Sequence, residues 1–173
     1  MRALITGVAA FIGSTLAGQL CYLYFVNFGV PTVSLRSFTV HGPRHRPDMG
    51  FHKFLRATIL GEPIAVFGDG EPTRDFTFVS DAVNANVLAA TRGVTGRVYN
   101  IGGGSRVSVN EVLEMIGRAG GRRPVITVDP AQKGDMQHTY ADTTFARADL
   151  GFTPTVGLEE GLVAEHQWLA GIL

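Results

Sequence analysis

The stretch from Gly68 to Thr77, GDGEPTRDFT, contains the residues best suited to bind an anion. A Gly-Asp-Gly turn is followed by Arg74, whose planar guanidinium offers several donors that match phosphate oxygens. Because the turn glycines carry no Cβ, backbone amides there can approach an anion closely. The pattern predicts a diphosphate site. The alternative is a surface hairpin in which Arg74 only pairs with Asp75 or caps the turn.

Composition narrows the possible partners. The 15 basic residues balance the 15 acidic ones, so no excess charge favours nucleic acid or an anionic membrane surface. The single cysteine, Cys21, excludes an internal disulfide framework and favours a reducing compartment, for which we expect the cytoplasm. Gly42-Pro43 lies between His41 and His45 and breaks the helix that would align them as ligands, so no metal site is expected.

The N-terminal segment allows two interpretations. No charged residue occurs between Arg2 and Arg36, which is also a feature of signal or membrane segments. Glycines interrupt this run, however, and residues 3–6 read as a short buried strand. We therefore expect neither a membrane span nor a signal core here.

Apolar spacing and turn residues predict an alternation of strands and helices. Strands are expected at 2–6, 32–40, 64–67, 97–101 and 124–128, and helices at about 14–27, 51–60, 81–91, 109–120, 143–150 and 158–169. Ser80 is the predicted N-cap of the third helix, and Ser108 with Glu111 forms a capping-box pattern at the fourth. Gly7 to Gly13 is a glycine-punctuated turn between the first strand and helix.

The order of motifs resembles the NAD-dependent epimerase/dehydratase branch of the extended short-chain dehydrogenase/reductases, nearest to its UDP-sugar 4-epimerases. Five blocks carry the resemblance: TGVAAFIGS (6–14), SLRSFTVHGPR (34–44), VFGDGEPTRDFTFVSD (66–81), YNIGGG (99–104) and QKGDMQHTYAD (132–142). They follow the family's own order over nearly all of residues 22–173.

The resemblance implies a sugar-nucleotide site in the C-terminal part of the chain. Arg74 would hold the diphosphate, and Asp135 matches a second nucleotide contact. Gln132 stands where an arginine is common, a variation that resembles the UDP-uronate epimerases. The backbone from Met49 to Phe51 and the strand at Val66 and Phe67 would flank the uracil, with Phe51 or Phe67 stacking on it or, alternatively, packing in the core.

The family's cofactor is NAD, and the resemblance places its turn at Gly7, Ala10, Phe11, Ile12 and Gly13. A dinucleotide turn of this type needs close approach of the pyrophosphate and an acidic residue about twenty positions later for the ribose. The methyl group of Ala10 crowds the middle position, and the first acidic residue in the chain is Asp48. NAD is therefore the family's cofactor but a doubtful ligand of this chain.

The family's catalytic pair is not found in the sequence. Its enzymes abstract a hydroxyl proton with a Tyr whose pKa is lowered by a Lys four residues later. No Tyr-x-x-x-Lys occurs among these 173 residues, and alignment with the helix that starts with this pair places Phe11 and Thr15 there. We name no catalytic residue and expect that well over a hundred residues of the family's chain are deleted internally.

The fold class expected is α/β: a truncated Rossmann-like parallel sheet of about three strands, from Ala3, Thr32 and Val98, joined to the family's small substrate-binding lobe. Residues 1–45 would form a residual βαβ unit. Residues 46–173 would form the sugar-nucleotide lobe, with a returning strand near 97–101, in one compact unit. The uncharged helix 14–28 is expected to mediate self-association, the alternative being a buried surface within a monomer.

These observations leave three functions open. The first is a UDP-sugar-binding protein without turnover on its own. The second is a nucleotide-sugar 4-epimerase or isomerase completed by oligomerisation or by a partner chain. The third is a structural remnant that docks on an intact epimerase and modulates it.

Overall fold

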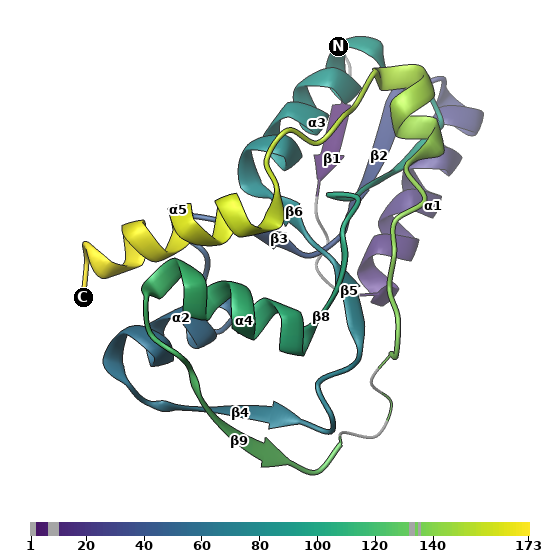
Figure 1. The fold of residues 1–173 in the computed structure, drawn as a ribbon. Coiled ribbons are helices and arrows are strands. Elements are labelled where there is room, and N and C mark those ends of the chain that lie inside the picture. The colour runs from purple at the N-terminus through teal and green to yellow at the C-terminus, as the bar shows by residue number, and fades with distance from the viewer. Residues whose placement is uncertain (1–2, 7–10, 132–133, 135) are drawn as a thin grey trace.

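The computed structural model describes residues 3–6, 11–131, 134 and 136–173, with side chains described from residue 18 onward. Its elements in chain order (Figure 1) are β1 (Ala3–Thr6), α1 (Phe11–Phe28), β2 (Thr32–Ser37), β3 (Val40–His41), α2 (Gly50–Leu60), β4 (Pro63–Phe67), β5 (Thr73–Asp75), β6 (Thr77–Phe78), α3 (Val79–Arg92), β7 (Val98–Ile101), β8 (Arg106–Ser108), α4 (Val109–Gly120), β9 (Val125–Asp129), the π-helix η1 (Ala146–Leu150) and α5 (Leu158–Ala170).

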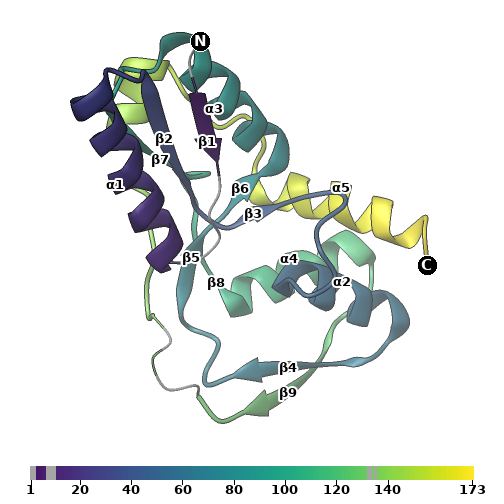
Figure 2. The same cartoon turned by 180° about the vertical axis from the view of Figure 1, so that it is seen from behind.

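A three-stranded parallel sheet forms one end of the molecule. Its strand order is β1-β2-β7, with Ala3 opposite Thr32 and Ser34 opposite Val98. Helices α1 and α3 lie on opposite sides of this sheet (Figures 1 and 2). The three strands expected from Ala3, Thr32 and Val98 are therefore confirmed.

Both faces of the sheet are covered, as short parallel strands require. On the α1 side, the hydroxyl of Thr32 donates to the carbonyl of Cys21 at 2.8 Å. On the other side, side chains of β2 and β7 pack against α3 and η1 in one apolar core: Val33, Leu35, Ala85, Ala89, Tyr99, Ile101, Ala146, Leu150 and Phe152. Three elements from the chain after residue 45 thus belong to this end of the molecule: the returning strand β7, and α3 and η1, which pack on the sheet.

A second lobe contains α2, α4 and α5 above the two-stranded parallel sheet β4-β9 (Figure 1). Its main core lies between the three helices and includes Leu55, Val112, Ile116, Leu162 and Leu169. Ile64 and Val66 of β4 face this lobe, where they pack with Ala57 and Leu113. The alternating burial along β4 follows from the two-residue period of a strand with one covered face.

Most helix boundaries follow the local sequence signals, with one clear exception. The capping box at α4 is confirmed, since the amide of Glu111 donates to Ser108 Oγ and the Ser108 amide donates to the Glu111 carboxylate. The prediction that Ser80 caps α3 is wrong, because that helix begins at Val79 with Phe78 at the cap position and no side-chain cap.

Two further differences concern segment shape. The strand expected over residues 32–40 is divided into β2 and β3, which belong to different sheets. The last turns of the helix expected over 143–150 are a π-helix closed by Gly151 at φ +68°. None of the helices in the described part of the chain is both long and apolar enough to cross a membrane.

Candidate functional site

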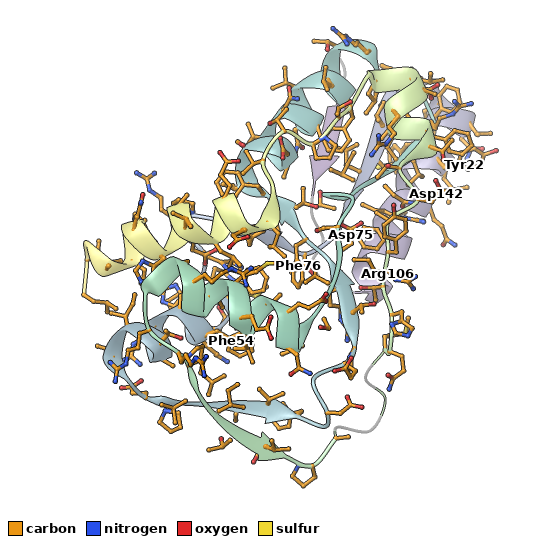
Figure 3. The ribbon with its side chains drawn as sticks, viewed as in Figure 1. Tyr22, Phe54, Asp75, Phe76, Arg106 and Asp142 are labelled. Carbon is orange, nitrogen blue, oxygen red and sulfur yellow. The ribbon has the colours of Figure 1, made fainter. Side chains whose placement is uncertain are left out.

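The candidate site lies where the parallel sheet meets the helical lobe. Strand β7 ends at Ile101 and leads directly into Gly102-Gly103-Gly104, so the glycine-rich loop leaves the carboxyl edge of the sheet. Figure 3 shows Asp75 and Phe76 in this region between the two lobes. The carboxyl edge of a parallel α/β sheet is where ligands of such folds bind.

Asp75 fastens three segments together. Its fully buried carboxylate accepts backbone hydrogen bonds from Gly103 at 3.0 Å, Gly104 at 3.2 Å and Ala141 at 3.1 Å. Burial raises the pKa of Asp75 from its ordinary value, against the lowering effect of these amides. The carboxylate therefore fixes the glycine loop and the C-terminal segment to β5.

Two glycines of this loop are required by close packing around β5. A Cβ on Gly103 would lie 1.8 Å from the carbonyl oxygen of Phe76, and one on Gly102 would lie 2.5 Å from Asp75 Oδ2. Real Cβ atoms essentially never come within 3.0 Å of another heavy atom, so a side chain at either position would force its neighbours to move. Close packing thus explains Gly102 and Gly103, whereas Gly104 has a positive φ of +76° and only Arg147 near its Cβ position.

Arg74 lies half-buried on β5, and its surroundings include the segment that follows residue 135. The Thr73 amide donates to Gln137 O at 2.8 Å, and the Thr139 amide donates to Thr73 O at 3.0 Å. Arg74 Nη1 donates to Thr73 O at 3.0 Å and reaches Gln137 O at 3.5 Å. Arg74 is therefore placed beside residues 137–139.

The Gly-Asp-Gly turn is held from α4. Asn110 Nδ2 donates to Asp69 O at 2.9 Å, and a Cβ on Gly70 would collide with the Asn110 side chain. The Gly68 amide donates to Asp129 O, and the Glu71 amide donates to Asp69 Oδ1. Because these two amides are engaged inside the protein, the expectation that the turn's backbone binds an anion is not supported at Gly68 and Glu71.

The two candidate aromatic residues have different environments. Phe51 is only 5% exposed and packs against Phe76, with ring centroids 4.5 Å apart, which favours core packing, the alternative to stacking on a base. Phe67, at the end of β4, is 48% exposed and is available for stacking. Val66 is buried under the helices and presents only its backbone.

A cavity of about 140 Å³ lies next to this region, and its walls are almost entirely apolar. The N-terminal end of α2 forms one wall through Met49, Gly50 and Phe51. The remaining lining residues are Thr39, His45, Phe54, Phe76, Val109 and Val112. The predicted substrate residues Met49 and Phe51 therefore share one cavity, whereas Arg74, Val66 and Phe67 do not line it.

The other predicted site residues are only partly within the described chain. Phe11, Ile12 and Gly13 form the first turn of α1, which follows β1 as the strand-turn-helix pattern predicts. Gly7, Ala10, Gln132 and Asp135 lie outside the described residues. No group of three His, Cys, Asp or Glu side chains within the described chain is arranged to hold a metal ion.

Sequence reasoning missed the functions of Asp75 and Asn110 as anchors. The available signals were an acid directly after the candidate arginine and a glycine triplet directly after a strand. Neither signal says which amides the acid binds, because the partners lie 28 to 66 residues away in the sequence.

Together, the parallel sheet and the glycine loop at its carboxyl edge are features of a Rossmann-like α/β architecture. The chain belongs to the NAD dependent epimerase/dehydratase family, whose model matches residues 16–102.

Relatives with curated descriptions point in the same direction. The chain is 38% identical over 157 residues to the uncharacterized UDP-glucose epimerase YtcB of Bacillus subtilis, covering 89% of this chain and 49% of that protein. It is 33% identical over 153 residues to the UDP-glucuronate 4-epimerase of Thermodesulfobacterium geofontis, covering 88% and 47%. The chain thus spans about half the length of the curated relatives it matches.

Solved structures share the fold. The UDP-glucuronic acid 4-epimerase of Bacillus cereus, in complex with UDP-glucuronic acid and NAD, aligns with a TM-score of 0.88 at 31% identity, covering 99% of this chain and 59% of that one. MoeE5, in complex with UDP-glucuronic acid and NAD, also aligns at 0.88, with 41% identity over 94% of this chain and 55% of its own.

Proposed function

We propose that this chain binds a UDP-sugar at the junction of its two lobes and does not carry out epimerisation on its own. The observation that carries the proposal is the placement of Arg74 on β5, fixed by the Asp75 anchor and paired with the segment after residue 135. In this proposal Arg74 and Asp135 contact the diphosphate, and Phe67 and the backbone at Met49 and Val66 flank the base. Two solved structures similar to this chain are complexes with UDP-glucuronic acid and NAD.

A thermal-shift measurement with UDP, UDP-glucose and UDP-glucuronate tests this proposal. A ligand at about 100 times its Kd stabilises the native state by about 2.7 kcal/mol, which raises Tm by roughly 5–10 °C for a chain of this size. UMP serves as the control because it has one phosphate fewer for Arg74 to bind. No rise in Tm with millimolar UDP or either UDP-sugar would contradict the proposal.

The absence of turnover is proposed from the residues themselves. The four tyrosines, Tyr22, Tyr24, Tyr99 and Tyr140, have no lysine four positions later. A general base of this kind needs that neighbouring positive charge to lower the tyrosine pKa. No product from UDP-glucose or UDP-glucuronate with NAD is therefore expected from the isolated chain.

The family's cofactor is NAD, and the described residues fit it only in part. Strand β1 and the N-terminus of α1 supply the strand and the helix dipole that a pyrophosphate needs. The ribose acid does not follow, since no acidic residue precedes Asp48. A calorimetric titration with NAD decides the point, and micromolar binding would favour an active enzyme over a binding protein.

A second candidate is an epimerase completed by another copy of the chain, and the exposed surface of α1 favours it. Six large apolar side chains between residues 20 and 28 are 45–73% exposed: Leu20, Tyr22, Leu23, Tyr24, Val26 and Phe28. An apolar surface of this extent is typical of an interface. We propose homo-oligomerisation through residues 14–28.

Light scattering on Leu23→Glu tests the proposed self-association. The charge should convert an oligomer to a monomer, whereas Val83→Glu, at an exposed apolar position on α3, should leave the mass unchanged. A monomeric wild-type chain would contradict self-association. Capture of an intact epimerase by that monomer would instead favour the third function, docking on a relative.

The free, buried Cys21 is consistent with a reducing compartment, and we keep the cytoplasm as the proposed one.

A further inference from the structure

A buried carboxylate joins helix α5 to the loop after β3. Glu165 has no exposed surface. Its Oε2 accepts the backbone N–H of Gly42 at 2.9 Å, and its Oε1 lies 3.0 Å from Nδ1 of His45. Nδ1 of His41 is 3.7 Å from Oε2, and the His41 and His45 side chains are 1% and 10% exposed. We call these three side chains, His41, His45 and Glu165, the clasp.

The loop that the clasp holds has an unusual backbone. Arg44 lies at φ +69°, in the left-handed region that non-glycine residues rarely adopt. The His45 amide donates to Gly42 O at 3.1 Å and closes a tight turn. A strained turn persists only where its surroundings fix it, and Glu165 bonds to both ends of this one.

The groups packed around the clasp are mainly uncharged. The His41 ring contacts three phenylalanines from α2 and from β5 to β6: Phe51, Phe76 and Phe78. The other nearby titratable and charged groups bond or pack elsewhere: His52 of α2 against Trp168, Arg118 of α4 with Glu159, Arg46 of the loop with Asp48, and His166 of α5 near Gly120, while Arg44 is exposed.

The charge of the clasp depends on one proton. With both imidazoles neutral, the clasp contains one buried carboxylate that accepts one amide N–H and one imidazole N–H. With one imidazole protonated, its net charge is zero, which is how a buried charge is best compensated. Within the described residues, His41 Nδ1 and His45 Nε2 have no hydrogen-bond partner, and a proton on His41 Nδ1 would face the carboxylate.

The clasp is connected to the candidate site through the chain itself. The loop continues into Met49, which stands at the N-cap of α2, and His45 and Met49 both line the apolar cavity. We propose that the clasp is a proton-linked latch that holds residues 42–49 in place, and that loss of its proton weakens ligand binding at the Met49 wall. Glu165 is a positioning residue here, and the ligand part of the inference rests on the proposed function.

The latch is tested without ligand by following the histidine Cε1–H resonances by NMR between pH 5 and 9. The His41 and His45 signals should shift together over a shared transition, while exposed His138 follows its own curve. In Glu165→Gln the shared transition should move to lower pH, because the buried negative partner of both imidazoles is removed. Glu160→Gln, an exposed change on the same helix, should leave it unmoved.

Independent titration of the two histidines, on curves that Glu165→Gln leaves unchanged, would overturn the latch. The measurement on the wild-type chain alone already decides whether the two signals move together, so it stands even if Glu165→Gln fails to fold.

The ligand part is tested by UDP affinity at pH 6 and pH 8.5. UDP itself titrates in this range and would change its own affinity with pH. We therefore take the ratio of the affinity at pH 6 to the affinity at pH 8.5, and compare this ratio in Glu165→Gln with the same ratio in Glu160→Gln. The Glu160→Gln ratio, like that of the wild type, should exceed the Glu165→Gln ratio by about threefold or more. Equal ratios would overturn the link to ligand binding. No UDP binding at either pH would contradict the proposed function, while the NMR result would still decide the latch.

Discussion

Replacing Asp75 tests whether its carboxylate holds the site together. It accepts amide hydrogen bonds from Gly103, Gly104 and Ala141 at 3.0, 3.2 and 3.1 Å in a fully buried position. In Asp75→Ala all three donors lose their acceptor, and at about 1–3 kcal/mol each, with partial relaxation, the total cost is about 3–5 kcal/mol. That is a large fraction of the roughly 5–15 kcal/mol by which domains are stable.

Asp75→Asn should cost less, about 1–3 kcal/mol, because its amide oxygen can keep the two bonds to Oδ1 while its NH₂ group faces the Ala141 N–H. Asp48→Asn, on an exposed pair with Arg46, is the matched control, with a change below about 0.5 kcal/mol. Urea unfolding measures all three free energies. If Asp75→Ala unfolds within about 0.5 kcal/mol of the wild type, the anchoring role assigned to Asp75 is wrong.

Three further predictions concern backbone packing, capping and pH. Gly103→Ala should lower the free energy of unfolding by about 2–4 kcal/mol, because the new Cβ would meet Phe76 O. The control Gly50→Ala has open space around the new Cβ and should be neutral or stabilising. Equal effects of the two substitutions would contradict this packing. Ser108→Ala should cost about 1 kcal/mol through the lost capping box, and exposed Ser80→Ala should change little; the reverse order would show that the caps are misassigned. Burial opposes ionisation of Glu165, but His41, His45 and the Gly42 amide outweigh it and lower its pKa below the ordinary 4.5. Its stabilisation is therefore present above pH 4.5 and lost as pH falls through the lowered value, so acid unfolding curves of Glu165→Gln should be flatter there than those of Glu160→Gln.

Local signals in the sequence were sufficient for most of the fold. The capping box at Ser108 and the alternation along β4 are read within a few residues, and both have the predicted form. The boundary of α3 was misplaced because Ser80 matches the N-cap preference, whereas the chain already enters the helix at Val79. Such a shift is decided by how α3 docks, including the bonds from Thr155 to Asp81, 74 residues away.

The site was less predictable because it depends on contacts distant in sequence. Nothing near residue 51 distinguishes a phenylalanine that stacks on a base from one that packs on Phe76, and only the fold places Phe51 inside and Phe67 outside. Glu165 reads as an ordinary polar position of an amphipathic helix, and its contact with Gly42 spans 123 residues. The turn pattern and the family resemblance both indicated Arg74, but only the structure shows the amide donors that fix its strand through Asp75.

The most direct test of the proposed UDP-sugar site is a calorimetric titration of UDP into the wild-type chain, Arg74→Gln and Arg56→Gln. Arg56 is an exposed arginine of α2 that pairs with Glu62, and it serves as the charge-matched control. We predict that the wild type and Arg56→Gln bind UDP alike, and that Arg74→Gln binds at least about tenfold more weakly, as loss of a charged hydrogen bond to phosphate implies. Equal UDP affinity in Arg74→Gln, or no binding by the wild type, would contradict the account.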